Sequence, residues 1–329
     1  MRPEISVIIT TYNTEKYIER AICSVLDQTF QSFEIIVVDD ASSDGTVDVV
    51  RGMADERIRL VVREKNIGMG ACRNIATKLA KGRWIALLDS DDWYDPGRFD
   101  KLLELARSHD ADMVADDLHL TQLEKTSVWS SWFKESGCEI EDETIVDSTF
   151  FVKTDQFGQR GLHLGLTKPM FKRDFLLERG LEYDEGNRLT PDYWFYLKCL
   201  VEGAKFVLTS KAYYFQFFRR GSLMRSGQIS RLNVDIETSK RFLSWDKVQQ
   251  DADLVAALKE NLVLYHRYIA YYHVADPLKE KNWPVAFRGM VQHPTFFLHF
   301  ARKLPAILSL RMDRYLGRNS DARNSMLPS

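Results

Sequence analysis

Three carboxylates are concentrated in residues 89–92, which read Asp-Ser-Asp-Asp. They follow a hydrophobic run, residues 84–88, that is typical of a buried strand. Carboxylate oxygens are the ligands that hard divalent cations prefer, and such a cation can bridge to phosphate groups. In an open α/β sheet, ligands bind at the carboxyl ends of the strands. The alternative is that the acids cap a turn, but a cap needs one acid, and Asp95 with Pro96 already supplies one.

Two further hydrophobic runs near the N-terminus also end in polar side chains. These side chains are Thr10, Thr11, Tyr12 and Asn13 after residues 5–9, and Asp39 and Asp40 after residues 33–38. Hydroxyls, an aromatic ring and a carboxylate suit a pyrimidine nucleoside, because the carboxylate accepts the imide N–H and the ring packs against the base. The pair at 39–40, followed by residues 42–45, is equally typical of a turn with a helix cap.

The first hundred residues alternate predicted strands and helices. The predicted strands are 5–9, 33–38, 58–63 and 83–88, and the predicted helices are 16–27, 46–54 and 70–80. This order predicts an α/β fold with a mainly parallel sheet and helices on both faces. The polar strand ends should therefore meet at one edge of the sheet. Arg73, on the third helix, is placed to meet either the phosphates of a ligand or the acids at 89–92.

The remainder of the chain predicts shorter elements and then a helical extension. Helices are expected at 97–109, 147–151, 172–179 and 192–202, strands at 112–120, 205–208 and 212–218, and mostly helix from residue 229 onward. Residues 121–144 have weak periodicity, which fits either a functional flap or a poorly ordered connection.

The composition excludes several classes of protein. A hydrophobic fraction of 45% with 28% charged residues is ordinary for a soluble globular protein, and a net charge of −2 gives no reason to expect a nucleic-acid partner. The cysteines Cys23, Cys72, Cys138 and Cys199 form no C-x-x-C pair, so a reducing cytoplasm is the expected compartment. No run reaches the roughly 18 apolar residues that cross a bilayer, and residues 5–10 are too short for a signal peptide.

Five segments of the N-terminal part form one recognisable set. They are residues 8–13 (Ile-Ile-Thr-Thr-Tyr-Asn), 37–46, 66–68 (Asn-Ile-Gly), 71–74 (Ala-Cys-Arg-Asn) and 88–92 (Leu-Asp-Ser-Asp-Asp). The set resembles the family 2 glycosyltransferases with the GT-A fold, and the match runs continuously from residue 4 to about residue 110. In that family these segments hold a nucleoside diphosphate sugar and a divalent cation, and the sugar is transferred with inversion at its anomeric carbon.

The resemblance implies a role for each matching residue. The nucleotide and sugar contacts it implies are Thr10, Thr11, Tyr12, Asp40, Arg73, Asp89 and Ser90. Within that set, Thr10, Tyr12 and Asp40 would contact the nucleoside. Asp91 would be the main ligand of a Mn²⁺ or Mg²⁺ ion. Asp89, the first acid of the D-x-D motif, would face the sugar or the ribose and is the second candidate ligand.

An inverting transferase of this family also needs a base on the acceptor side. The family supplies it from an acidic pair, usually Glu-Asp, at the start of a helix about 100 residues beyond the metal motif. Pro191 and Asp192 occupy that location, so the usual Glu is replaced and the base position, Asp192, is kept. A carboxylate in the first turn lies near the positive end of the helix dipole, which favours the ionised form that a base needs. A helix start of Pro followed by Asp, without a catalytic role, fits the same residues.

Two basic segments resemble those of the family's exopolysaccharide enzymes. The first is residues 168–173, and the second includes Arg219, Arg220 and Ser222. Their positive side chains would close over the diphosphate leaving group or contact the acceptor. A solvated basic turn explains them equally well. The lone His163, between Gly161 and Gly165, is expected to be structural.

The resemblance also implies the organisation of the whole chain. It places a GT-A domain at 1–225, divided into a nucleotide-sugar half at 1–110 and an acceptor half at 111–225, followed by a helical region at 226–329. From Pro284 to Ser329 there are seven Lys or Arg against two Asp, a net charge of +5. Basic residues mixed with Trp and Phe suit a membrane interface, but the same aromatic side chains suit core packing or a homodimer contact.

Together these features and the resemblance predict an inverting, metal-dependent glycosyltransferase. Its expected donor is a UDP-sugar, with glucose the first guess, and its expected acceptor a lipid-linked oligosaccharide of an exopolysaccharide or surface polysaccharide. It would act in the cytoplasm, with the cytoplasmic face of the inner membrane as an alternative location. A non-catalytic sugar-binding protein on the same scaffold is the main alternative. A sugar-phosphate nucleotidyltransferase would need a glycine-rich basic loop after the first strand, and residues 10–13 do not form one. A dinucleotide oxidoreductase would need a third glycine after Gly68 and Gly70, and the chain lacks it.

Overall fold

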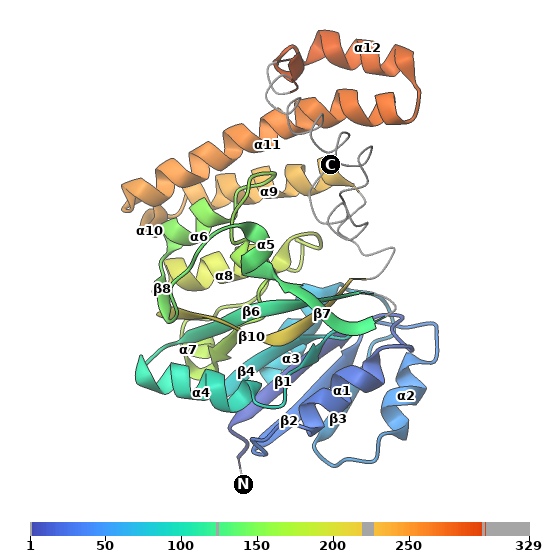
Figure 1. Cartoon of the computed structure of the whole chain (residues 1–329), viewed down its shortest axis with the longest axis vertical. Coiled ribbons are helices and arrows are strands. Elements are labelled where there is room, and N and C mark those ends of the chain that lie inside the picture. The colour runs from blue at the N-terminus through green and yellow to red at the C-terminus, as the bar shows by residue number, and fades with distance from the viewer. Residues whose placement is uncertain (1, 123–124, 219–226, 298–299, 301–329) are drawn as a thin grey trace. The chain divides into compact units, whose positions relative to one another are not determined.

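The computed structural model describes residues 2–122, 125–218, 227–297 and 300 (Figure 1). The chain divides into two compact units. The first unit comprises Met1–Asp155 and Arg160–Arg220, and the second comprises Gln156–Gln159 and Gly221–Ser329. The acids at 89–92, the polar strand ends and Asp192 all belong to the first unit, so the candidate site is described within it.

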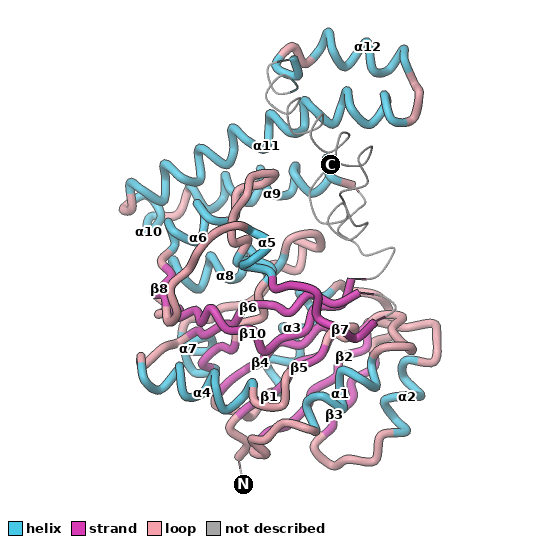
Figure 2. The backbone as a smooth tube through the Cα atoms, viewed as in Figure 1, coloured by secondary structure: helices cyan, strands magenta, loops and turns pink. Residues whose placement is uncertain are grey.

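The first unit is built on one mixed β-sheet (Figure 2). Its strands are β1 (Ile5–Thr11), β2 (Phe33–Asp39), β3 (Ile58–Val62), β4 (Trp84–Asp89), β5 (Trp93–Tyr94), β6 (Met113–Gln122), β7 (Lys125–Ser131), β8 (Thr144–Val146), β9 (Met170–Lys172) and β10 (Phe206–Phe218). The main path runs β3-β2-β1-β4-β9-β6-β10-β5, with β7 beside β6 and β8 beside β10. The first four strands are parallel, whereas β9 is antiparallel to both of its neighbours.

Helices connect the parallel strands, as the alternating pattern predicts. They are α1 (Ile18–Leu26), α2 (Thr46–Gly52), α3 (Met69–Leu79) and α4 (Arg98–Ser108), followed by α5 (Trp132–Ser136), α6 (Ser148–Thr154), a 3₁₀ turn η1 (Leu164–Leu166), α7 (Arg173–Glu178) and α8 (Pro191–Val201). Strand β1 is apolar along most of its length because both of its faces are covered. Ile5, Val7 and Ile9 are buried on one face, and Ser6 and Ile8 are buried on the other. The predicted α/β fold with a mostly parallel sheet and helices is confirmed.

Two expectations for the second half of the sheet need correction. Residues 121–144 are not one irregular connection, because β7 pairs with β6 as a hairpin and α5 follows it. The predicted strands 205–208 and 212–218 are not separate, because residues 206–218 form the single strand β10. The register of β10 against β6 shifts between Leu208 and Ala212 and again before Tyr214. Such irregularities interrupt the alternation of buried and exposed residues that marks a continuous strand.

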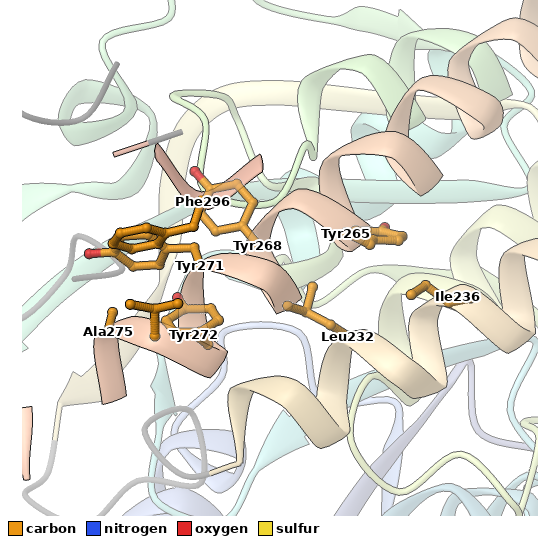
Figure 3. Packing of buried hydrophobic residues seen from close by; sticks show 9 residues of the cluster. Leu232, Ile236, Tyr265, Tyr268, Tyr271, Tyr272, Ala275 and Phe296 are labelled. Atoms are coloured by element: carbon orange, nitrogen blue, oxygen red, sulfur yellow. The ribbon is translucent and has the colours of Figure 1, made fainter. Parts of the chain in front are cut away.

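The second unit is helical, as predicted. Its helices are α9 (Gln228–Leu243), α10 (Asp246–Gln249), α11 (Ala252–Lys279) and α12 (Trp283–Gln292). Leu232 and Ile236 of α9 belong to a buried cluster with four tyrosines of α11 and with Phe296 (Figure 3). The phenol of Tyr268 donates a hydrogen bond to the carbonyl of Gly158, 2.8 Å away, which satisfies its polar end. Across the described part of the chain, no helix is long and apolar enough to span a membrane.

Candidate active site

The parallel register brings the polar strand ends to one edge of the sheet. Thr10 on β1 lies opposite Asp89 on β4, and Thr11 lies opposite Asp39 on β2. Asp40 follows β2 directly, and its N–H donates to the carbonyl of Thr11 at 2.9 Å. The ends of β1, β2 and β4 therefore form one continuous polar edge.

The side chains that follow β1 have different surroundings. Thr10 is half-buried, and Thr11 is buried with its hydroxyl 2.5 Å from that of Thr14. Tyr12 is 51% exposed, so its ring presents a flat surface to solvent at the edge where β1 ends. An exposed aromatic face of this kind suits stacking against a planar ligand.

Asp40 holds the loop that leads into α3. One of its carboxylate oxygens accepts the N–H of Ile67 at 2.7 Å and the other accepts the N–H of Gly68 at 2.8 Å. Gly68 has a φ of +93°, which glycine adopts without strain. Each carboxylate oxygen has two lone pairs, so Asp40 retains acceptor capacity while it fixes the start of the helix that carries Arg73.

The three acids at the end of β4 have distinct environments. Asp92 is buried, and its two oxygens accept the Tyr214 hydroxyl at 2.7 Å and the N–H of Phe217 at 2.8 Å. Burial, with the nearby charges of Asp91 and Asp89, raises the pKa of Asp92 well above its usual range. Asp92 therefore joins the acid loop to β10 and is turned into the fold.

Asp91 lies in the same loop, between the buried Ser90 and Asp92. It is half-buried, and its backbone carbonyl accepts a hydrogen bond of 2.7 Å from Arg20, whose guanidinium stacks 3.9 Å from the ring of Trp93. Ser90, before it, is buried. These contacts hold the backbone of the loop between the anchored side chains of Asp89 and Asp92.

Asp89 faces two cations. Its Oδ1 lies 3.0 Å from Nη2 of Arg73, and its Oδ2 lies 3.0 Å from Nζ of Lys168. Burial would raise the pKa of this carboxyl, but Lys168 and Arg73 outweigh that effect and hold the pKa below its usual value. Of the two roles open to Arg73 in the sequence, the structure shows contact with the acids.

Asp192 faces the same two cations from the start of α8. Pro191 occupies the first turn of this helix, where its missing N–H costs nothing. The carboxylate of Asp192 accepts hydrogen bonds from Nη1 of Arg73 and from Nζ of Lys168, the latter at 3.0 Å. Although the two residues are about 100 positions apart in sequence, Asp89 and Asp192 thus share both of their cationic partners.

We call Arg73, Asp89, Lys168 and Asp192 the charge cluster. Two positive and two negative side chains balance in a largely buried position, where an unpaired charge would be costly. Burial lowers the pKa of Lys168, but the carboxylates of Asp192 and Asp89 outweigh it and raise the pKa above the ordinary range. The ammonium therefore stays charged.

Lys168 is the member of the charge cluster whose partners the sequence did not indicate. Its backbone carbonyl accepts a 2.6 Å hydrogen bond from Arg98, and Arg98 forms a fully buried ion pair with Asp116 at 2.7 Å. The sequence signal for this lysine is its place in the basic segment 168–173, directly before Pro169. In the same basic run, Lys172 lies opposite Trp84 at the amino end of β4, so it is at the other edge of the sheet.

Other expected residues are placed as follows. Arg219, Arg220 and Ser222 lie outside the described residues. His163 Nδ1 is 3.0 Å from Asp155, and the same carboxylate accepts the N–H of Gly165, which fits the structural role expected for this histidine. Within the described ranges, no group of three or more His, Cys, Asp or Glu side chains could hold a metal ion.

A family model and two relatives match this chain. The model of the family described as Glycosyl transferase family 2 matches residues 6–175. The succinoglycan biosynthesis proteins ExoO and ExoU of Rhizobium meliloti (strain 1021) are 32% and 29% identical to the chain. The ExoO match covers 99% of this chain and 92% of ExoO, and the ExoU match covers 93% and 86%.

A solved structure supports the fold. The crystal structure of Staphylococcus aureus TarS 1–349 in complex with UDP-GlcNAc superimposes with a TM-score of 0.65 at 23% identity, covering 87% of this chain and 79% of that one. The resemblance inferred from the strand-end motifs is confirmed, and the chain belongs to glycosyl transferase family 2.

Proposed function

We propose that the chain transfers a sugar, with glucose as the first candidate, from a UDP-sugar to a lipid-linked oligosaccharide in exopolysaccharide or surface-polysaccharide synthesis. The observation that carries the proposal is the charge cluster, in which Asp192 lies beside the acid loop after β4. The names of ExoO and ExoU support the pathway, and the UDP-GlcNAc of the TarS complex supports a UDP-sugar donor.

The donor end of the site would use the edge formed by β1, β2 and β4. The exposed ring of Tyr12 would pack against the base, with Thr10, Thr11 and Asp40 supplying polar contacts to the nucleoside. Ser90 and Asp89 would lie toward the sugar or the ribose. Arg73 would act from behind Asp89, because its guanidinium is committed to the two carboxylates.

We assign one divalent cation to Asp91 because it matches the main metal ligand of the D-x-D motif. The oxygens of Asp89 already face Arg73 and Lys168, and those of Asp92 accept bonds from Tyr214 and Phe217. A cation beside Asp89 would meet two positive charges at close range, so Asp91 is the better ligand and Asp89 the second candidate. Mg²⁺ and Mn²⁺ accept one or two carboxylates together with substrate phosphates, and the ion would offset the charge of the diphosphate.

The acceptor end would use Asp192. Arg73 and Lys168 hold its carboxylate in one orientation and balance its charge. The acceptor oxygen would bond to the anomeric carbon while the bond from that carbon to the UDP oxygen breaks. The hydroxyl proton passes to Asp192 and the electron pair leaves with UDP. Attack opposite the leaving group inverts the anomeric configuration.

A panel of donors tests the proposal. UDP-glucose, UDP-galactose, UDP-N-acetylglucosamine and UDP-glucuronate would each be incubated with the purified chain and Mn²⁺ or Mg²⁺, with and without a bacterial lipid extract as acceptor. We expect one donor to release UDP faster than the others, with further acceleration by the extract. Binding of UDP without turnover of any donor would instead identify a non-catalytic sugar-binding protein.

The second unit offers a surface for reaching a lipid-linked acceptor. Trp283, Phe287 and Val291 recur every four residues on α12 and are 67%, 70% and 66% exposed. Such spacing places them on one helical face. The exposed Arg288 lies on the same helix, and residues 301–329 contain six Lys or Arg against two Asp. We propose that this face docks on an anionic membrane surface, and a homodimer contact is the outcome that would replace it.

A further inference from the structure

The side chain of Lys168 connects the two halves of the candidate site. Its Nζ lies 3.0 Å from Oδ2 of Asp89 and 3.0 Å from Oδ2 of Asp192, while Arg73 binds the Oδ1 atoms of the same two carboxylates. Every oxygen of the two acids therefore accepts from one cation of the pair. A carboxylate held at both oxygens cannot rotate without breaking a charged hydrogen bond.

The backbone of Lys168 is held from several sides. Its carbonyl accepts the 2.6 Å bond from Arg98, which is itself fixed by the buried pair with Asp116. The preceding residue, Thr167, donates its hydroxyl to Leu164 and accepts the Tyr196 hydroxyl from α8 at its carbonyl. Pro169 follows and restricts Lys168 to extended backbone. The ammonium is thus carried on a rigid support, which is what a positioning group requires.

From this geometry we propose that Lys168 is a positioning residue that sets the orientation of Asp192 relative to the donor-side Asp89. This inference rests on the proposed function, because it assigns Lys168 to the same transfer reaction. In this role Lys168 would act through the two carboxylates that it contacts, and not directly on the reacting atoms or the diphosphate. Its compact ammonium bridges two carboxylates, whereas the larger planar guanidinium of arginine would not occupy the same point between them.

Two substitutions separate this role from simple loss of structure. Lys168→Met keeps the length of the side chain and removes its charge. Lys172→Met is the matched control, because Lys172 is in the same segment but pairs with Asp112, 3.5 Å away, at the amino end of β4. We expect Lys168→Met to lower kcat by about 10²-fold, the typical effect of misplacing a catalytic group, with little change in the Kd for UDP. The control should retain wild-type turnover.

A double-mutant cycle shows whether Lys168 acts through Asp192. If it does, adding Lys168→Met to Asp192→Asn should cost almost nothing further, because residues that act as a unit are strongly non-additive. Multiplicative effects on kcat, or a rise in the Kd for UDP that matches the fall in kcat, would overturn the proposal and assign Lys168 to the diphosphate.

Chemical rescue covers the case in which Lys168→Met folds poorly. In Lys168→Ala, added propylammonium should restore part of the turnover, whereas tetramethylammonium at the same concentration should not. Absence of rescue in a variant with a wild-type Tm would contradict the positioning role. Turnover by the wild-type chain with the donor panel is measured first, so failure of the proposed function is distinguished from failure of this inference.

Discussion

The hydroxyl of Tyr214 donates to Asp92 at 2.7 Å and accepts the N–H of Asp89 at 3.2 Å. One phenol on β10 therefore fixes both ends of the acid loop, with Asp91 between them. The loop is held at the sheet edge by a strand that comes more than a hundred residues later in the chain. This relationship predicts that the shape of the loop depends on β10, which also pairs with β5 directly after the loop.

Replacing Tyr214 by Phe tests that dependence. Loss of the hydroxyl leaves the buried Asp92 oxygen without its donor, which should lower the free energy of unfolding by about 1–3 kcal/mol. Chemical denaturation measures this change, and titration with UDP and Mn²⁺ should show weaker binding. Tyr213→Phe, at the neighbouring half-buried position, is the control. Equal effects of the two substitutions would contradict the role of Tyr214.

Replacing Asp192 by Asn tests the proposed base. The amide cannot accept the hydroxyl proton, so transfer should fall by about 10²–10⁴-fold, the range typical of general base catalysis. Binding of UDP should persist, because Asp192 is on the acceptor side. Radiolabelled sugar transfer and calorimetric UDP titration measure the two properties. Asp184→Asn, at an exposed position on the preceding loop, serves as control, and wild-type turnover of the Asp192 variant would remove this residue from the mechanism.

Replacing Asp91 by Asn tests the metal assignment. The substitution removes a charged oxygen ligand, so the Mn²⁺ dependence of UDP binding should weaken while metal-free UDP binding changes little. A titration of Mn²⁺ at fixed UDP concentration provides the measurement. If Asp89→Asn alone altered the metal dependence and Asp91→Asn did not, the ligand would be Asp89.

Stability should depend on pH through Asp117 on β6. Burial raises the pKa of this carboxyl, although its oxygen accepts the N–H groups of Leu118 and Phe133. The folded state then binds more protons than the unfolded state, so stability falls as pH rises from the unfolded pKa of about 3.9 to the raised folded pKa. Asp117→Asn lacks this loss, and its stability relative to wild type should increase by up to about 1.4 kcal/mol per pH unit within that window. The prediction would be contradicted if the difference in unfolding free energy between Asp117→Asn and wild type were the same at pH 4 and at pH 7.

The exposed face of α12 should bind anionic vesicles. Trp283→Ser with Phe287→Ser removes two side chains that would each contribute about 1.5–3 kcal/mol when buried, so partitioning should fall by at least about tenfold. Sedimentation with phosphatidylglycerol vesicles is compared with phosphatidylcholine vesicles. Val263→Ser changes a 50% exposed position on α11 and is the control. Unchanged partitioning, with loss of a dimer in light scattering, would assign this face to self-association.

The N-terminal half of the fold is predictable because its strands are continuous apolar runs with polar residues at their ends. Strand order then follows from the short helical connections, and it brings the ends of β1, β2 and β4 together. The partners of Lys168 are not predictable in this way. Its contact with Asp89 joins residues 79 positions apart and depends on β9 pairing antiparallel with β4. Local periodicity in the sequence does not predict such a pairing. The β6–β7 hairpin and the single strand β10 are also not predictable from the sequence. Register shifts in both pairs interrupt the alternation of buried and exposed residues that marks a strand.

The two hydrogen bonds between Asp40 and the backbone at 67–68 limit how the donor preference of this chain can be engineered. Because Asp40 is one of the proposed nucleoside contacts, it would be the first position to alter when another nucleobase is wanted. Its carboxylate also fixes the start of α3, and Arg73 is the fifth residue of that helix. Replacing Asp40 would therefore displace Arg73, which binds the proposed base Asp192. We expect such variants to have a lower transfer rate with every donor. Remodelling the exposed surface around Tyr12 leaves those hydrogen bonds intact and is the better starting point.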